Sequence, residues 1–225
     1  MDRRDVGLCL VATAAALVCV RLGVWQLDRL GERRARHAEV RAARAQPAIA
    51  LTGLGLPADS ARQRRILVRG VLDYTYERVW AARSYQGVPG VHLITPLRLP
   101  DGAGVLVDRG WVPSPDARRV DRAAFREPAE TVEVAGLAWA APRARGDVDP
   151  RALAESLPYP LLPFVVQWLP PPERSSGSPV RLPAPALDDG PHLIYAVQWF
   201  SFAAIAVVGT AFLLRQRGKA RDAGS

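Results

Sequence analysis

A histidine and two aromatic residues recur at helical spacing near the start of a C-terminal apolar stretch. His192, Tyr195 and Trp199 stand at i, i+3 and i+7. Ala196 and Ala203 fall on the same helix face. An imidazole at a membrane boundary, with aromatic rings and small residues beside it, can form one wall of a site for a flat aromatic cofactor. The alternative is an interfacial aromatic belt in which the histidine caps the helix.

Two apolar stretches must position these side chains. Residues 193–214 carry no charge and are numerous enough to cross a hydrocarbon layer of roughly 30 Å as a helix. Residues 6–25 contain one charge, Arg21, which can snorkel to the interface, and they end at Trp25. A cleaved signal peptide is the competing interpretation, but no small-x-small site follows the apolar run. Two spans place Trp25 and His192 at the same membrane face, because the intervening region leaves and re-enters the membrane there.

The sequence therefore predicts an α+β membrane protein in which two transmembrane helices flank a β-rich extracytoplasmic domain. Basic residues follow both spans, so the two charge clusters favour opposite orientations. A long translocated domain largely escapes the positive-inside rule, and we therefore expect both termini to be cytoplasmic. We expect a bacterial plasma membrane, since the apolar run begins too early to leave room for a transit peptide. The expected parts are a cytoplasmic N-terminus (1–5), a span (6–25), the domain (26–191), a span (192–214) and a basic cytoplasmic tail (215–225).

Short segments rich in β-branched and aromatic residues fill the central region. They are 65–72, 76–83, 91–97, 105–111, 131–139 and 164–169. This spacing is typical of an antiparallel sheet or small open barrel. The charged residues 26–44 predict a helical stalk that continues the first span, and residues 149–155 predict a short capped helix. The proline-rich residues 170–191 predict an extended tether to the second span rather than a packed element.

Composition argues against several classes of function. The chain has 30 Lys and Arg against 22 Asp and Glu, a net charge of +8, but both signs are interspersed and no basic stripe alternates with aromatics. We therefore expect no nucleic-acid binding. Both cysteines, Cys9 and Cys19, lie in the first apolar stretch, so the central domain cannot assemble a thiolate copper or zinc site.

The central region also has no catalytic motif of the H-E-x-x-H, G-x-S-x-G or C-x-x-C type, and the sequence predicts that the protein is not an enzyme. His37 is expected to be solvated, and His92 follows a Pro-Gly turn. The other candidate acid–base groups are expected in surface or cross-strand ion pairs: Glu77, Arg83, Asp108 and Arg109.

Three motifs, in this order, resemble the surfeit-locus cytochrome c oxidase biogenesis proteins (the Shy family). The first is G-V-W-Q at residues 23–26. The second begins with R-G-V-L-D at 69–73 and ends with L-V-D-R-G-W-V-P at 106–113. The third, H-L-I-Y-A-V-Q-W-F, occupies 192–200. The match is poor only over 140–190.

The resemblance implies an assembly factor for a haem-copper cytochrome c oxidase, which binds haem a and delivers it for insertion into the catalytic subunit. It implies that His192 is the axial ligand of the haem iron and that Trp25, Tyr195 and Trp199 line the pocket. The implied partners are the oxidase catalytic subunit, haem a synthase and the lipid bilayer. The alternative is a cofactor-free membrane scaffold that holds oxidase subunits or the haem a synthesis machinery during assembly.

Overall fold

The computed structural model describes most of the 225 residues, in four stretches: 3–128, 130–139, 148–171 and 178–222. Part of the predicted tether, residues 172–177, lies outside these stretches. The chain divides into two compact units. One comprises residues 1–39 and 187–225, and the other comprises residues 40–186.

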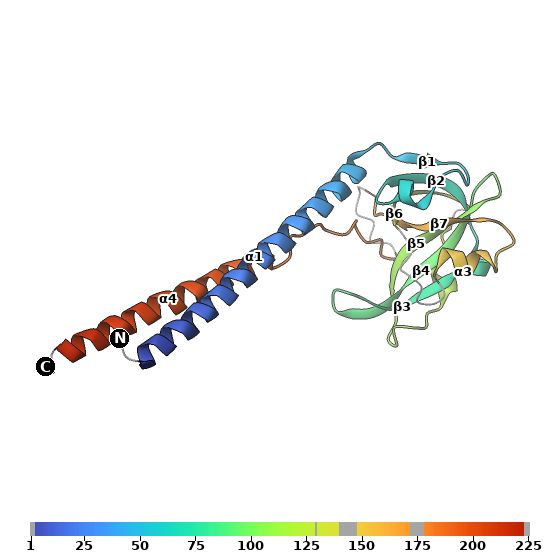
Figure 1. Cartoon of the computed structure of the whole chain (residues 1–225). Coiled ribbons are helices and arrows are strands. Elements are labelled where there is room, and N and C mark those ends of the chain that lie inside the picture. The colour runs from blue at the N-terminus through green and yellow to red at the C-terminus, as the bar shows by residue number, and fades with distance from the viewer. Residues whose placement is uncertain (1–2, 129, 140–147, 172–177, 223–225) are drawn as a thin grey trace. The chain divides into compact units, whose positions relative to one another are not determined.

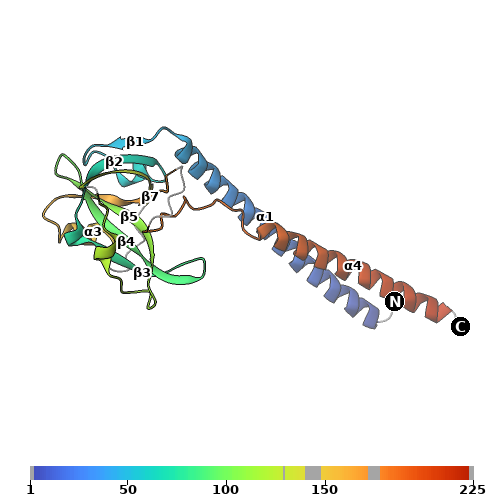
Figure 2. The same cartoon turned by 180° about the vertical axis from the view of Figure 1, so that it is seen from behind.

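The first unit is a pair of long helices, which lie side by side in two opposite views (Figures 1 and 2). α1 spans Arg3–Ala45 and α4 spans His192–Asp222. The unbroken course of α1 confirms the helical continuation predicted for residues 26–44. Both helices are long and apolar enough to cross a membrane. Large apolar side chains such as Val11 (70 % exposed) and Ile194 (73 % exposed) cover their outer faces. A helix from the core of a soluble protein would bury such side chains, whereas lipid accepts them.

Small residues bring the two helices together. Ala196 and Ala203 on α4 are 1 % and 7 % exposed. A Cβ atom at Gly23 on α1 would lie 2.7 Å from the Phe200 ring, so only glycine accepts the ring in its present position. Close approach at small residues is the usual way in which membrane helices associate.

The second unit is a β-barrel with extra strands at its edges (Figure 1). The strands are β1 (Ile49–Leu51), β2 (Arg65–Leu72), β3 (Arg78–Tyr85), β4 (Val88–Arg98), β5 (Gly104–Pro113), β6 (Thr131–Trp139) and β7 (Leu161–Trp168). Their order is β1-β2-β6-β7-β5-β4-β3, and an additional β2–β4 pairing closes the five strands from β2 to β4 into a barrel. This confirms the predicted α+β architecture of two candidate membrane helices flanking a β-rich domain. The closure and the parallel pairs β1–β2 and β5–β7 go beyond what was predicted.

The burial pattern explains why these segments form a barrel. Alternate residues of β2 point into the core, as expected for a strand with one solvated face. β5 is buried at all but its last residue, and it pairs with β4 along one edge and with β7 along the other. Within the described stretches, four short helices connect the strands: α2 (Ala58–Ala61), η1 (Tyr74–Tyr76), η2 (Arg122–Phe125) and α3 (Pro150–Ala154). Asp149 caps α3, as predicted for residues 149–155.

The C-terminal part of the predicted tether packs on the barrel, so the expectation of an unpacked segment is wrong for residues 178–186. Val180 forms a two-hydrogen-bond bridge with Trp111, with N–O distances of 2.7 and 2.9 Å. Gln167 Nε2 donates a hydrogen bond to the Leu182 carbonyl at 2.9 Å. The prolines around these residues lack N–H groups, which limits the pairing to one bridge instead of a full strand.

Candidate functional site

A hydrogen bond between the two helices fixes the imidazole of His192. This residue begins α4, and its Nδ1 lies 2.9 Å from Oε1 of Gln26 on α1. An amide oxygen only accepts hydrogen bonds, so Nδ1 is the protonated nitrogen and Nε2 carries the lone pair of the neutral ring. Metal-ligating histidines commonly have this arrangement, in which an acceptor holds one nitrogen and the other nitrogen is directed at the metal.

Two ion pairs tie the chain to α1 immediately before His192. Arg33 Nε donates to the Asp188 carbonyl at 2.9 Å, and its Nη2 lies 3.3 Å from the Asp188 carboxylate. Arg34 Nε donates to Asp189 Oδ2 at 2.8 Å. Exposed pairs of this kind contribute little to stability individually. Together they fix the entry of the chain into α4, and therefore the position of the imidazole beside α1.

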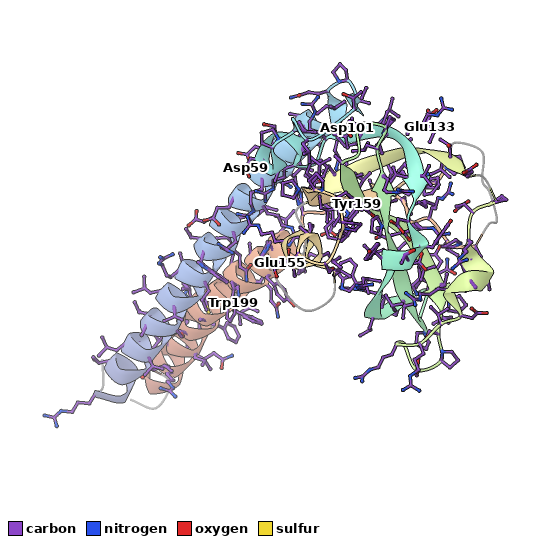
Figure 3. All side chains as sticks on the ribbon, turned by 90° about the vertical axis from the view of Figure 1, so that its right-hand side faces the viewer. Asp59, Asp101, Glu133, Glu155, Tyr159 and Trp199 are labelled. Atoms are coloured by element: carbon purple, nitrogen blue, oxygen red, sulfur yellow. The ribbon has the colours of Figure 1, made fainter. Side chains whose placement is uncertain are left out.

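The predicted site residues on α4 are divided between its inner and outer faces. His192 and Trp199 are partly buried on the side that includes the fully buried Ala196. Trp199 is labelled on α4 in Figure 3, and its ring packs edge-on against Phe202 at 5.9 Å. Tyr195 is on the outer side and 46 % exposed. The residues predicted to share one helix face therefore do not all lie on the packed side of α4, because Tyr195 is on the outer side.

Trp25 contributes a second exposed aromatic ring from α1. It is 46 % exposed and directly precedes Gln26, the residue that holds His192. The helix pair thus places the imidazole against Gln26, the residue after Trp25, and leaves the rings of Trp25 and Tyr195 available for external contacts. Neither ring is used to fill the interface between the helices, so their exposure needs another explanation, either lipid or a bound aromatic group.

The central motif forms a buried network in the barrel. Arg109 and Glu77 are 0 % and 1 % exposed, and Arg109 Nη1 donates to Glu77 Oε2 at 2.8 Å. Thr95 donates to the same carboxylate oxygen at 2.5 Å, and the Phe125 carbonyl accepts a hydrogen bond from Arg109. The expected ion pairing is confirmed for these two residues, but the pair is buried and does not lie on the surface. Each buried charge is neutralised by the other, so removal of either side chain would leave an uncompensated charge inside the barrel.

A second supported histidine lies in the barrel. His92 Nδ1 on β4 is 2.9 Å from both carboxylate oxygens of Asp108 on β5, which is the cross-strand pairing expected for Asp108. Sequence reasoning did not assign a partner to His92 or a role to Gln26. Gln26 could have been found from its place in the G-V-W-Q motif, directly after a predicted site residue.

The architecture and the site define a chain with two candidate membrane helices, a β-barrel domain and a supported histidine at the head of the second helix. The SURF1 family matches residues 13–204, and the chain belongs to this family, which is associated with cytochrome c oxidase assembly. It is similar to an uncharacterized SURF1-like protein of Mycobacterium tuberculosis, with 26 % identity over 235 residues that cover 96 % of this chain and 85 % of the relative. A SURF1-like protein of Monosiga brevicollis is also 26 % identical, over 246 residues that cover 96 % and 91 % of the two chains. The family resemblance seen in the sequence motifs is confirmed.

Proposed function

We propose that this protein binds haem a through His192 and delivers it for insertion into the catalytic subunit of cytochrome c oxidase. The observation that carries the proposal is the hydrogen bond from His192 Nδ1 to Gln26, which directs the lone pair to Nε2. Membership of the SURF1 family supplies the association with oxidase assembly. The family is one of assembly factors, and we propose the same non-catalytic role here.

The residues at the head of α4 suit haem. When bound, haem a would supply an iron centre that His192 could ligate and a large apolar ring that aromatic side chains could contact. No hydrogen bond to His192 Nε2 occurs within the described part of the chain. The half-exposed rings of Trp25 and Tyr195 provide aromatic surface for a planar group. The partly buried ring of Trp199 lies on α4, one turn beyond Tyr195.

A single histidine ligand suits delivery better than storage. Among the described residues, no group of three or more His, Cys, Asp or Glu side chains is placed to hold a metal ion. One imidazole held by a neutral amide makes a bond that an acceptor protein can replace, whereas a fully ligated site retains its metal. We therefore infer that the site is built for transfer, with the oxidase catalytic subunit as recipient and haem a synthase as donor.

The proposed setting is a bacterial plasma membrane with the barrel outside the cytoplasm. The exposed apolar faces of α1 and α4 suit lipid. Arg215 and Arg217 follow the apolar part of α4, and basic residues close to a span favour the cytoplasmic side. In this arrangement His192 lies at the outer face, where α4 begins.

The test is haem retention by the full chain purified in detergent from cells that make haem a. We expect the wild-type protein to carry haem a in its absorption spectrum and His192→Ala to lose most of it. Gln198→Ala is the matched control, because Gln198 is an exposed side chain on the same helix, and its spectrum should be unchanged. Added imidazole should partly restore the spectrum of His192→Gly. If His192→Ala retains the full haem spectrum and supports full oxidase haem content, the cofactor-free scaffold replaces this proposal.

A further inference from the structure

The barrel contains a cavity of about 460 Å³ whose wall combines two indole rings with the His92–Asp108 pair. Trp80 and Trp139 stack with ring centroids 5.4 Å apart and an interplanar angle of 22°. His92 packs edge-on against Trp80 at 6.0 Å. Leu137 completes an apolar wall. Pockets of this size, largely apolar with a few fixed polar groups, are typical of small-molecule sites.

One β-bulge brings Asp108 to the side of the sheet that carries His92. In the β4–β5 register, Leu93 pairs with Gly110 but Ile94 pairs with Asp108, so Arg109 is an extra residue. Because side chains alternate along a strand, one inserted residue moves Asp108 to the face shared by Ile94 and His92. The bulge places Gly110 at a φ of +126°.

A second, independent bulge brings Arg83 to the same face. In the β3–β4 register, Trp80 pairs with His92 and Arg83 pairs with Gly90, so β3 also has one extra residue. The Arg83 guanidinium stacks 3.6 Å above the Trp80 ring. The pKa of Arg83 is lowered by burial, and the Asp108 carboxylate only partly opposes this shift. Two interruptions of regular pairing therefore converge on one face, and bulges are often found where a side chain is aimed at a ligand.

The chemistry of the pair leaves one nitrogen of His92 without a structural role. The Asp108 side chain is 5 % exposed and also accepts a hydrogen bond from Gly110 N at 3.1 Å. Its oxygens accept the proton of His92 Nδ1. In the neutral ring, Nε2 is then a hydrogen-bond acceptor. Within the described stretches no protein group donates to Nε2, although the histidine needs only Nδ1 to satisfy Asp108.

We propose that this cavity is a binding site for a flat aromatic molecule that carries a hydroxyl group, separate from the site on the helix pair. The aromatic ring packs against the indoles of Trp80 and Trp139 that line the cavity, and the hydroxyl donates to His92 Nε2. The buried carboxylate behind the ring strengthens the acceptor through a hydrogen-bond chain from ligand to His92 to Asp108. The site does not depend on haem binding at His192, so each proposal can fail alone.

The test uses 7-hydroxycoumarin and 7-methoxycoumarin, which share a flat ring but differ in the hydroxyl donor. Binding to the full-length protein in detergent is measured by calorimetry, with empty micelles subtracted, at a pH that keeps the hydroxyl protonated. We expect saturable binding of 7-hydroxycoumarin, and at least about tenfold weaker binding of the methoxy compound because one hydrogen bond is lost. His92→Phe should remove this preference, and Trp139→Leu should weaken both compounds.

His37→Phe is the matched control, because it makes the same exchange on α1 and should leave both affinities unchanged. The ¹⁵N resonance of His92 Nε2 in the wild-type protein provides a second measurement that needs no substitution. It should shift with 7-hydroxycoumarin and not with the methoxy compound. Absence of saturable binding, equal affinities for the two compounds, or an unchanged preference in a folded His92→Phe variant would each overturn the proposal.

Discussion

The helix pair and the barrel each hold a histidine by Nδ1, but by different means. His192 is 2.9 Å from the neutral amide of Gln26, and the contact joins two helices at positions 166 residues apart in the chain. His92 is 2.9 Å from both oxygens of Asp108, and the contact joins two adjacent strands. The amide partner belongs to a pair of helices with exposed outer faces. The carboxylate partner is buried in a closed barrel.

The two partners, an amide and a carboxylate, suit different roles of a histidine side chain. A carboxylate draws the imidazole proton strongly and, when buried, fixes the ring through a charge-assisted hydrogen bond. A neutral amide sets the same tautomer with a weaker bond. The His192 arrangement therefore suits a ligand that is taken up and released, whereas the His92 arrangement suits a fixed recognition element. Predictions that alter either support test this distinction directly.

The largest expected effect comes from removing the charge pair beside Asp108. Arg109→Met leaves the buried Glu77 carboxylate without its charged partner, and breaking a buried pair in this way costs about 3–5 kcal/mol. Urea unfolding of the barrel, followed by tryptophan fluorescence, measures the loss. Arg65→Met is the matched control, because Arg65 is exposed on β2, and its unfolding midpoint should barely change. If both variants unfold alike, the Arg109–Glu77 pair does not contribute to the stability of the barrel.

A smaller and more specific effect is expected at Gln26. Gln26→Ala removes the acceptor for His192 Nδ1, and loss of such outer partners typically weakens metal binding about 10–100-fold. Gln26→Glu gives His192 the kind of partner that His92 has, so haem release should slow. Haem dissociation to an excess of apomyoglobin measures both variants, and neither should change the unfolding of the barrel. Equal dissociation rates in all three proteins would remove the proposed distinction between amide and carboxylate support.

The elements of both regions could be predicted from local sequence, but their contacts could not. Periodicity and β-branched content located six strands, and the lack of charge in 193–214 located the core of α4. The three-residue strand β1 is too short to give a pattern. Barrel closure depends on the pairing of Leu72 with Leu97, which only the tertiary structure determines.

The polar contacts of both sites escaped prediction for the same reason. The bulge at Arg109 decides which face Asp108 occupies, and a one-residue insertion leaves no trace in the pattern of a fully buried strand. Gln26 and His192 were both visible in motifs, but their contact depends on how closely α1 and α4 pack at Gly23. The packed part of the proline-rich segment was missed because its single bridge at Val180 has no sequence signature.

The smallest expected effect compares Asp108 with an exposed carboxylate just beyond β5. Asp116 accepts hydrogen bonds from the N–H groups of Arg118 and Arg119 at 2.9 and 2.8 Å and from the Ser114 hydroxyl at 2.9 Å. These bonds favour the charged form and lower the pKa of Asp116 from 3.8 to about 2. Because the folded pKa lies below the unfolded one, the ionised carboxylate stabilises the loop above the unfolded pKa.

This contribution is lost as the pH falls through the folded value. Asp116→Asn should therefore lower the stability of the barrel slightly at about pH 5, and the difference from wild type should shrink between about pH 4 and pH 2. The ¹³C resonance of the Asp116 carboxyl group measures its titration directly, and urea unfolding at each pH measures the linked stability. The loop lies outside the cavity, so 7-hydroxycoumarin binding should not change in Asp116→Asn. A stability difference that is constant across this pH range would show that backbone amides do not select the charged form of Asp116.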